Sequence, residues 1–217
     1  MSLTAGEKIT RVDDAYLRLK EAIRSSDLAP NEQLTEPEIA GRLGMSRTPV
    51  REALIRLTSD GLVKLIPRHG ALILPVSKKD MEEIYDILSV LEPAAAYKLA
   101  ERRPSAEVLK PLYESVQNMQ KAVEAEDLEA WAQADDAFHT LFLELQGNSR
   151  IVAMVSVLYD QAHRARVMTL NKRKMPVQST REHSDILQAL SDGDPQRAHD
   201  LFKNHRERAA KELLALM

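Results

Sequence analysis

The sequence predicts a mainly α-helical protein of two domains: an N-terminal domain of three helices and a β-hairpin, and an all-α bundle of six to seven helices. Apolar residues recur at helical spacing along most of the chain, and only residues 62–74 contain the short apolar runs typical of strands. Pro75 and Val76 separate the hairpin from the first long helical segment. We therefore expect one domain at 1–75 and the other at 76–217.

The composition limits what kind of protein this is. With 217 residues, of which 44% are hydrophobic, the chain can form two small hydrophobic cores. It contains no cysteine, so disulfides and thiolate metal sites are excluded, and a metal ion must be bound by His, Asp or Glu. No apolar run approaches the roughly 20 residues of a membrane span, and the N-terminus lacks the apolar core of a signal peptide. We expect a cytoplasmic protein without membrane contact.

The first 45 residues predict two helices with a turn between them. Residues 15–25 have the spacing of an amphipathic helix, and 27–31 have the composition of a turn. Thr35 can cap a second, short helix. A third helix begins soon afterwards, with Ser46 or Thr48 as its cap. Two short helices joined by a three-residue turn are typical of a helix-turn-helix.

The hairpin and the C-terminal helices complete the predicted fold. Two apolar runs, 62–66 and 71–74, are separated by a polar tip at 67–70, which predicts the wing of a winged helix-turn-helix. Ser77 can cap the next helix, and no strand pattern recurs after it. Prolines, glycines and capping residues divide the remaining sequence into segments. We expect helices at 78–103, 105–125, 128–146, 149–171, 178–191 and 195–216.

Basic residues are concentrated around the second helix of the helix-turn-helix. The net charge of the chain is −3, but residues 41–70 contain six Lys and Arg against two acidic residues. Residues 1–75 carry eleven basic against ten acidic residues, whereas 76–217 carry nineteen against twenty-three. Such a patch can contact DNA phosphates. Charged residues also form ordinary solvated surfaces, so charge alone leaves both interpretations open.

The second helix of a helix-turn-helix enters the major groove, where its N-terminal residues meet base edges. Arg47 suits the two acceptors of guanine, Ser46 and Thr48 can bond a phosphate or a base edge, and Arg51 can reach the backbone. The alternative is that both arginines are ordinary surface residues. At the wing tip, a glycine permits close backbone approach to the minor groove. The wing residues expected to contact DNA are Arg68, His69 and Gly70.

The stretch LGMSRTPVREAL at 43–54, continued at 60–63, resembles the winged helix of the GntR superfamily. The hairpin at 67–71 and the turn at 28–34 are similar to those of the family as well. The resemblance implies a transcriptional regulator that binds a double-stranded DNA operator, and not an enzyme. Pro37 differs from the family pattern, because some members have an operator-reading arginine there. The operator sequence therefore does not follow from the resemblance.

Three histidines and one carboxylate lie on apolar stripes of the predicted C-terminal helices. Asp135 and His139 are four residues apart and share a helix face. His183 and His205 lie among apolar residues of the last two helices. One carboxylate and three imidazoles suit a divalent ion such as zinc or nickel, with positions left open for a ligand. A histidine on an apolar face can also be a hydrogen-bonded core residue, but a buried Asp135 needs a positive partner.

The stretch 135–139, the Glu182-His183 pair and a histidine on the last helix resemble the metal-binding pattern of the FCD effector domain. This domain occurs in the FadR-type branch of the GntR superfamily, and the two resemblances together cover about residues 10–210. The resemblance implies a domain that binds an effector, and it leaves Asp136 facing solvent. The metal ligands that it implies are Asp135, His139, His183 and His205.

A small organic acid is the expected effector, because its carboxylate can fill the open metal positions while an arginine neutralises it. Arg164 and Arg166 are candidates for effector binding, although ordinary surface roles fit both. His163 is a further candidate for the cavity. Leu88 departs from the family, in which many members have an arginine at this position, so the usual anion-binding arrangement does not carry over.

We expect a homodimer that places two recognition helices on the half-sites of a palindromic operator and changes its DNA affinity when the effector binds. The main alternative is a helical-bundle metal-dependent hydrolase, since metal-bound water can hydrolyse esters or phosphates. The sequence contains no paired Glu-x-x-His motifs to support this alternative. A second alternative is an adaptor module with an incidental helix-turn-helix pattern, which the length of the match from Ser46 to Leu54 disfavours.

Overall fold

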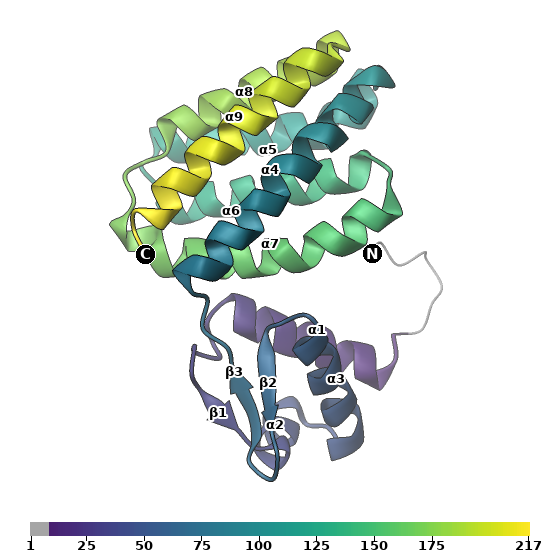
Figure 1. The fold of residues 1–217 in the computed structure, drawn as a ribbon, viewed down its shortest axis with the longest axis vertical. Coiled ribbons are helices and arrows are strands. Elements are labelled where there is room, and N and C mark those ends of the chain that lie inside the picture. The colour runs from purple at the N-terminus through teal and green to yellow at the C-terminus, as the bar shows by residue number, and fades with distance from the viewer. Residues whose placement is uncertain (1–8) are drawn as a thin grey trace. The chain divides into compact units, whose positions relative to one another are not determined.

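The computed structural model describes residues 9–217, which divide after Val76 into two compact units (Figure 1). Residues 1–8 of the N-terminal domain expected at 1–75 lie outside the described residues. The predicted fold class is confirmed: three helices and a small sheet are followed by helices alone. No helix within 9–217 is both long enough and apolar enough to cross a membrane.

The N-terminal unit is a winged helix-turn-helix. A core of apolar side chains that includes Leu19, Leu54 and Leu57 holds its helices against the sheet. Thr10 and Thr35 begin two of the helices with capping boxes, in which side chain and backbone satisfy each other's free groups. The elements are α1 (Arg11–Arg24), β1 (Gln33–Leu34), α2 (Glu36–Leu43), α3 (Arg47–Ser59), β2 (Val63–Ile66) and β3 (Gly70–Ile73).

The sheet has a third strand that the sequence did not predict. β1 pairs antiparallel with β3, placing Leu34 opposite Ala71, so the strand order is β1-β3-β2. Gly70 begins β3 with φ at +86°, and a Cβ atom there would lie 2.1 Å from the carbonyl oxygen of Leu34. The close approach of β1 therefore requires glycine at this position. Close approach of the backbone to DNA, the reason for a glycine that the sequence suggested, is not needed to explain the glycine at position 70.

The C-terminal unit contains six α-helices within the described residues, as predicted. The helix expected at 149–171 ends earlier, and the chain continues in a short 3-10 turn, η1 (Leu170–Lys172). Ser77 caps the first helix with a capping box. The helices are α4 (Lys78–Glu101), α5 (Ala106–Glu124), α6 (Leu128–Leu145), α7 (Ser149–Thr169), α8 (Val177–Asp192) and α9 (Pro195–Leu214).

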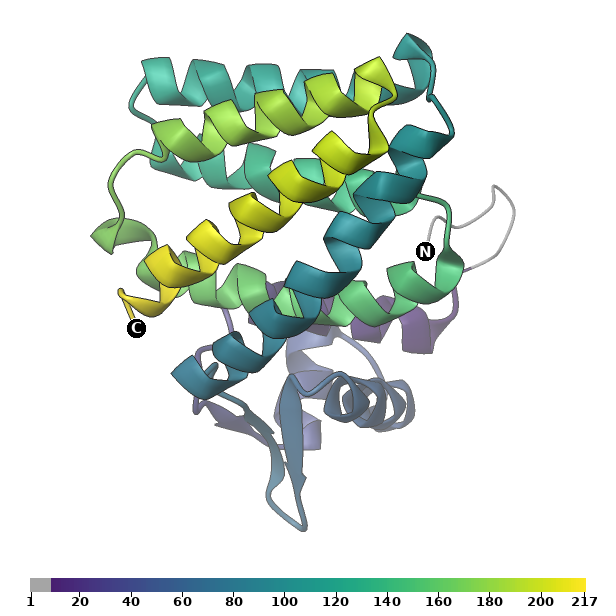
Figure 2. The same ribbon diagram turned by 45° about the horizontal axis from the view of Figure 1, so that its top comes forward.

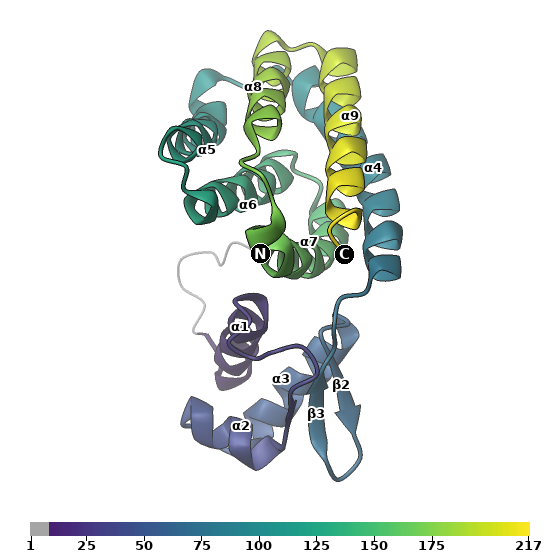
Figure 3. The ribbon, with the colours of Figure 1, turned by 90° about the vertical axis from the view of Figure 1, so that its left-hand side faces the viewer.

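Helix packing in this unit creates one central core. α9 runs along α4 and also contacts α8, while α5 packs against α6 and α8 (Figures 2 and 3). Phe138, Phe142 and Phe202 are fully buried in this core. Three of the six histidines are buried beside these rings, on α6, α8 and α9. The packing therefore brings together histidines that are far apart in the sequence.

Candidate nucleic-acid interface and candidate metal centre

The start of α3, from Ser46 to Thr48, is exposed and lacks a side-chain cap. Ser46 is the N-cap residue, but its hydroxyl makes no capping hydrogen bond, in contrast to Thr10 and Thr35 in α1 and α2. The first turn also contains no acidic residue. Its peptide N–H groups and the positive end of the helix dipole are therefore available to an anion such as a phosphate. Arg47 and Thr48 are exposed beside them.

Half of the basic residues in the predicted patch are paired with acidic residues of the protein. Arg42, Arg51 and Arg56 form ion pairs with acidic residues of the same unit, at N–O distances of 3.3, 3.9 and 2.8 Å. The other three side chains make no hydrogen bond or ion pair within residues 9–217, and each is exposed. These three residues are Arg47, Lys64 and Arg68.

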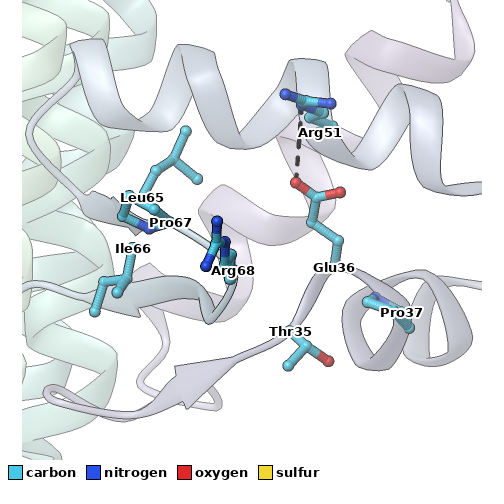
Figure 4. Close-up of a pocket in the computed structure, with 9 residues that line it drawn as sticks. Thr35, Glu36, Pro37, Arg51, Leu65, Ile66, Pro67 and Arg68 are labelled. Atoms are coloured by element: carbon cyan, nitrogen blue, oxygen red, sulfur yellow. Dashed lines mark ion pairs between the residues drawn. The ribbon is translucent and has the colours of Figure 1, made fainter.

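A groove of about 360 Å³ lies between the start of α2, the side of α3 and the wing (Figure 4). Arg51 faces Glu36 across it, and Arg68 of the wing lines the same groove. The side chain of Arg51 is 71% exposed, so its ion pair with Glu36 is weak. DNA phosphates can therefore replace Glu36 as the partner of Arg51 at little cost. Pro37 also lines the groove and offers it no charge.

The wing tip is held in place by the sheet. Arg68 has a left-handed backbone with φ at +67°, which turns the chain between β2 and β3. The side-chain amide of Gln33 donates to the carbonyl oxygen of His69 at 3.1 Å. Both tip side chains, those of Arg68 and His69, are exposed. The predicted DNA-binding residues thus lie at the exposed start of α3 and on a supported wing.

The four predicted metal ligands lie together in the C-terminal unit. One ring nitrogen from each of His139, His183 and His205 lies within 4.8 Å of the other two. Asp135 places Oδ1 3.4 Å from Nε2 of His183 and 3.7 Å from Nε2 of His139. All four residues are buried. Three imidazoles and one carboxylate at these spacings suit a divalent ion such as zinc or nickel.

Two of the histidines are fixed in the tautomer that metal binding requires. His183 donates from Nδ1 to the carbonyl oxygen of Ser179 at 2.7 Å. His205 donates from Nδ1 to a carboxylate oxygen of Glu182 at 2.9 Å. A histidine that donates from one ring nitrogen keeps the lone pair on the other, so Nε2 of both rings is available to an ion.

His139 is in the opposite tautomer. Its Nδ1 lies 2.9 Å from Nη2 of Arg206, which can only donate, so Nδ1 accepts and Nε2 carries the proton. That proton is directed at Nε2 of His183, 3.2 Å away. An ion at Nε2 of His139 requires the proton to move to Nδ1. Glu92, whose Oε1 lies 3.8 Å from Nδ1 of His139, is the neighbouring carboxylate that can then accept a hydrogen bond from Nδ1.

The electrostatics of the cluster keep the histidines neutral. Burial, together with the charge of Arg206, lowers the pKa of His139 to about 3. Burial likewise lowers the pKa values of His183 and His205. Burial alone would raise the pKa of Asp135, but His139 and Arg166 beside it hold that pKa well below its ordinary value. Neutral imidazoles and an ionised carboxylate are the forms that bind a metal ion, so the residues fit one.

One of the two arginines predicted to bind the effector lines the cavity beside the histidine cluster. Arg166 lines it and donates to Asp136 at 2.9 Å, whereas Arg164 is buried but does not line the cavity. The ordinary surface roles suggested for both arginines are therefore wrong. Asp136, predicted to face solvent, is partly buried and ion-paired. His163 contacts Asp136 at 3.1 Å and does not line the cavity.

Sequence reasoning missed a buried polar network behind His139. Glu92 on α4 is fully buried and accepts hydrogen bonds from the hydroxyl of Tyr159 and from Arg206, whose Nη2 lies 2.6 Å from Oε1. Arg206 also orients His139. Helical spacing could have predicted that Glu92 is buried. Glu92 follows the buried Leu88 by four residues on α4, so both lie on the inward face of the helix. Leu88 itself is a fully buried core residue.

Two family models match the chain. The model of the FCD domain matches residues 83–208, and the model described as bacterial regulatory proteins, gntR family, matches residues 11–73. Together they cover most of both units. The FCD match contains all four residues of the candidate metal centre, and the gntR match contains the exposed start of α3 and the wing.

Proteins similar in sequence to this chain are named as transcriptional regulators. An HTH-type transcriptional regulator from Agrobacterium vitis is 44% identical over 140 residues, which are 62% of this chain and 82% of that protein. The transcriptional repressor RspR of Escherichia coli is 28% identical, covering 82% of this chain and 79% of RspR. Among solved structures, E. coli McbR/YncC has a TM-score of 0.81 at 22% identity, over 95% of this chain and 98% of that one, and so shares the fold.

Proposed function

The chain belongs to the GntR family of bacterial DNA-binding transcriptional regulators and carries an FCD domain, and from this premise we propose that a metal-bound small carboxylate controls its operator affinity. In this proposal, the N-terminal unit reads the operator and the C-terminal unit binds the ion and the effector. The convergence of three neutral histidines and Asp135 in one buried cluster is the observation that carries the proposal.

The DNA-binding part of the proposal rests on α3 and the wing. Arg47 reads a guanine edge, Ser46 and Thr48 bond a phosphate or a base edge, and Arg51 exchanges Glu36 for a phosphate. The wing residues Arg68, His69 and Gly70 lie along the minor groove. Two chains in a homodimer would present two such surfaces to the half-sites of a palindrome. Exposed Ile87 and Val90 on α4 support a self-association surface on the C-terminal unit.

The regulatory part rests on the open positions of the metal centre. Four protein ligands leave a six-coordinate ion two positions for water or for the carboxylate of an effector. An effector that contacts the ion ties together α6, α8 and α9, because the ligands come from all three helices. It can then favour one arrangement of the DNA-binding units over another and change operator affinity by a coupling free energy. The matched families and named relatives are regulators, so a hydrolase is not proposed.

Replacing His183 with alanine is expected to remove the bound metal. The variant loses one of three imidazoles from the cluster, and removal of a direct ligand should weaken metal binding by at least the roughly 10- to 100-fold that is typical of removing a supporting residue. Metal content per chain, measured by mass spectrometry after zinc loading and desalting, should fall from about one ion to a small fraction. Operator binding should lose its response to small acids while the N-terminal unit stays folded.

The matched control is His199→Ala, because His199 lies on the same bundle but is partly exposed and pairs with Asp200. This variant should retain its zinc. A His183→Ala protein that keeps a full complement of zinc would contradict the proposed site. Circular dichroism of both variants shows whether each has folded.

A further inference from the structure

The cavity beside the histidine cluster is lined by four arginines, and three of them already hold carboxylates. Arg206 is paired with Glu92, and Arg208 donates to Glu182 at 2.6 Å from both Nε and Nη2. Arg166 pairs with Asp136 and lies 3.9 Å from Asp135. The positive charge of these three side chains is therefore compensated within the protein.

Arg173 is the fourth of these arginines, and its guanidinium forms no ion pair with a carboxylate of the described residues. It follows η1 in the connection between α7 and α8 and lines the cavity, and its guanidinium makes no hydrogen bond or ion pair with any part of the chain that the structure describes. Its side chain is half-buried, and burial lowers its pKa. A guanidinium that loses water without gaining a partner is unfavourable, so this position suits an anion from outside the chain.

We propose that Arg173 binds a carboxylate of the effector that is separate from the group at the metal ion, so that the effector is a small dicarboxylic acid. An arginine fork engages both oxygens of one carboxylate, which leaves neither oxygen well placed to chelate the ion. A ligand that satisfies both the ion and Arg173 therefore needs two acidic groups. This inference rests on the proposed function and names the chemical class of its effector.

The connection that carries Arg173 can also admit such a ligand. The cavity holds only about 20 Å³, which is room for about one water molecule and not for an organic acid. One part of its wall is the segment between η1 and α8, where Arg173 has an extended backbone and Pro176, the residue before α8, provides no side-chain cap. This segment can move outward without breaking a helix. A diacid would then close the cavity again by drawing Arg173 towards it.

The test compares diacids with monoacids on zinc-loaded full-length protein by titration calorimetry. The probes are malonate and malate, against glycolate and lactate. Wild-type protein should bind the diacids about 10-fold or more tightly than the monoacids, as expected for one additional charge-assisted contact. Arg173→Gln should lose this preference and still bind the monoacids. Lys174→Gln, which removes an exposed neighbouring charge, should keep it.

The outcomes separate this inference from the proposed function. If wild-type protein shows no preference for diacids, or if Arg173→Gln keeps the preference, Arg173 does not have this role, while binding of any acid still supports the metal-centred effector site. If no acid binds to zinc-loaded protein, both proposals fail. Zinc content and the melting temperature of each variant show that the cavity is intact in the protein tested.

Discussion

Replacing Arg47 with alanine is expected to weaken binding to the operator by roughly 10- to 100-fold, the loss typical of one bidentate contact to a base. Arg47 is exposed at the first position of α3 and has no partner within residues 9–217 that would compete for its guanidinium. Binding to DNA of unrelated sequence should fall much less, because phosphate contacts dominate it. The measurement is a pair of dissociation constants, for a duplex selected by the wild-type protein and for a scrambled duplex.

Arg11→Ala is the control for loss of charge alone. Arg11 begins α1 of the same unit and is exposed, but it lies outside the first turn of α3 and the wing. Its removal should affect both duplexes slightly and equally. If Arg47→Ala still distinguishes the two duplexes as well as the wild-type protein does, Arg47 is not the residue that reads the operator.

Replacing Glu92 with leucine is expected to lower the free energy of unfolding of the metal-free protein by about 3–5 kcal/mol. Arg206 is only 1% exposed, so without Glu92 its charge stays buried and unpaired. Urea unfolding in the presence of a chelator measures the effect. Trp131, the single tryptophan of the chain, is buried on α6 and reports unfolding of the C-terminal unit by its fluorescence.

Two further variants test the cause of this loss. The double variant Glu92→Leu/Arg206→Met removes both charges and should recover much of the lost stability, because an apolar pair can replace a buried ion pair. Asp192→Ala breaks the exposed pair with Arg197, whose N–O distance is 3.1 Å, and should cost less than about 1 kcal/mol. A single variant as stable as the wild-type protein would show that the pair does not hold α4 and α9 together.

The parts of the fold that follow from local chemistry could be predicted from the sequence. Thr35 and Ser77 were expected to cap helices, and each does so through its side chain. The strand β1 was missed, because two residues carry no periodicity and Leu34 becomes a strand residue only by pairing with Ala71. Such pairing depends on tertiary structure, which a local pattern does not contain.

The histidines of the candidate metal centre could be predicted from the sequence, but the buried charged residues beside them could not. Apolar periodicity places His139, His183 and His205 on inward faces, and the structure brings them together. Glu92 and Arg206 behind them were not found, because charged side chains are ordinarily assigned to the surface. Arg173 lies in a basic run between two helices, a context that does not distinguish a cavity residue from a solvated one. Their roles depend on which carboxylates the fold places beside them.

The most direct test of the central claim is the operator dissociation constant of zinc-loaded protein, measured with and without malate, beside the same measurement on chelator-treated protein. We expect malate to change the constant at least about 5-fold for the zinc-loaded protein, within the usual range of allosteric coupling, and to leave the chelator-treated protein unchanged. Equal constants under all four conditions, with malate shown to be bound to the zinc-loaded chain, would contradict control of DNA binding through the histidine cluster.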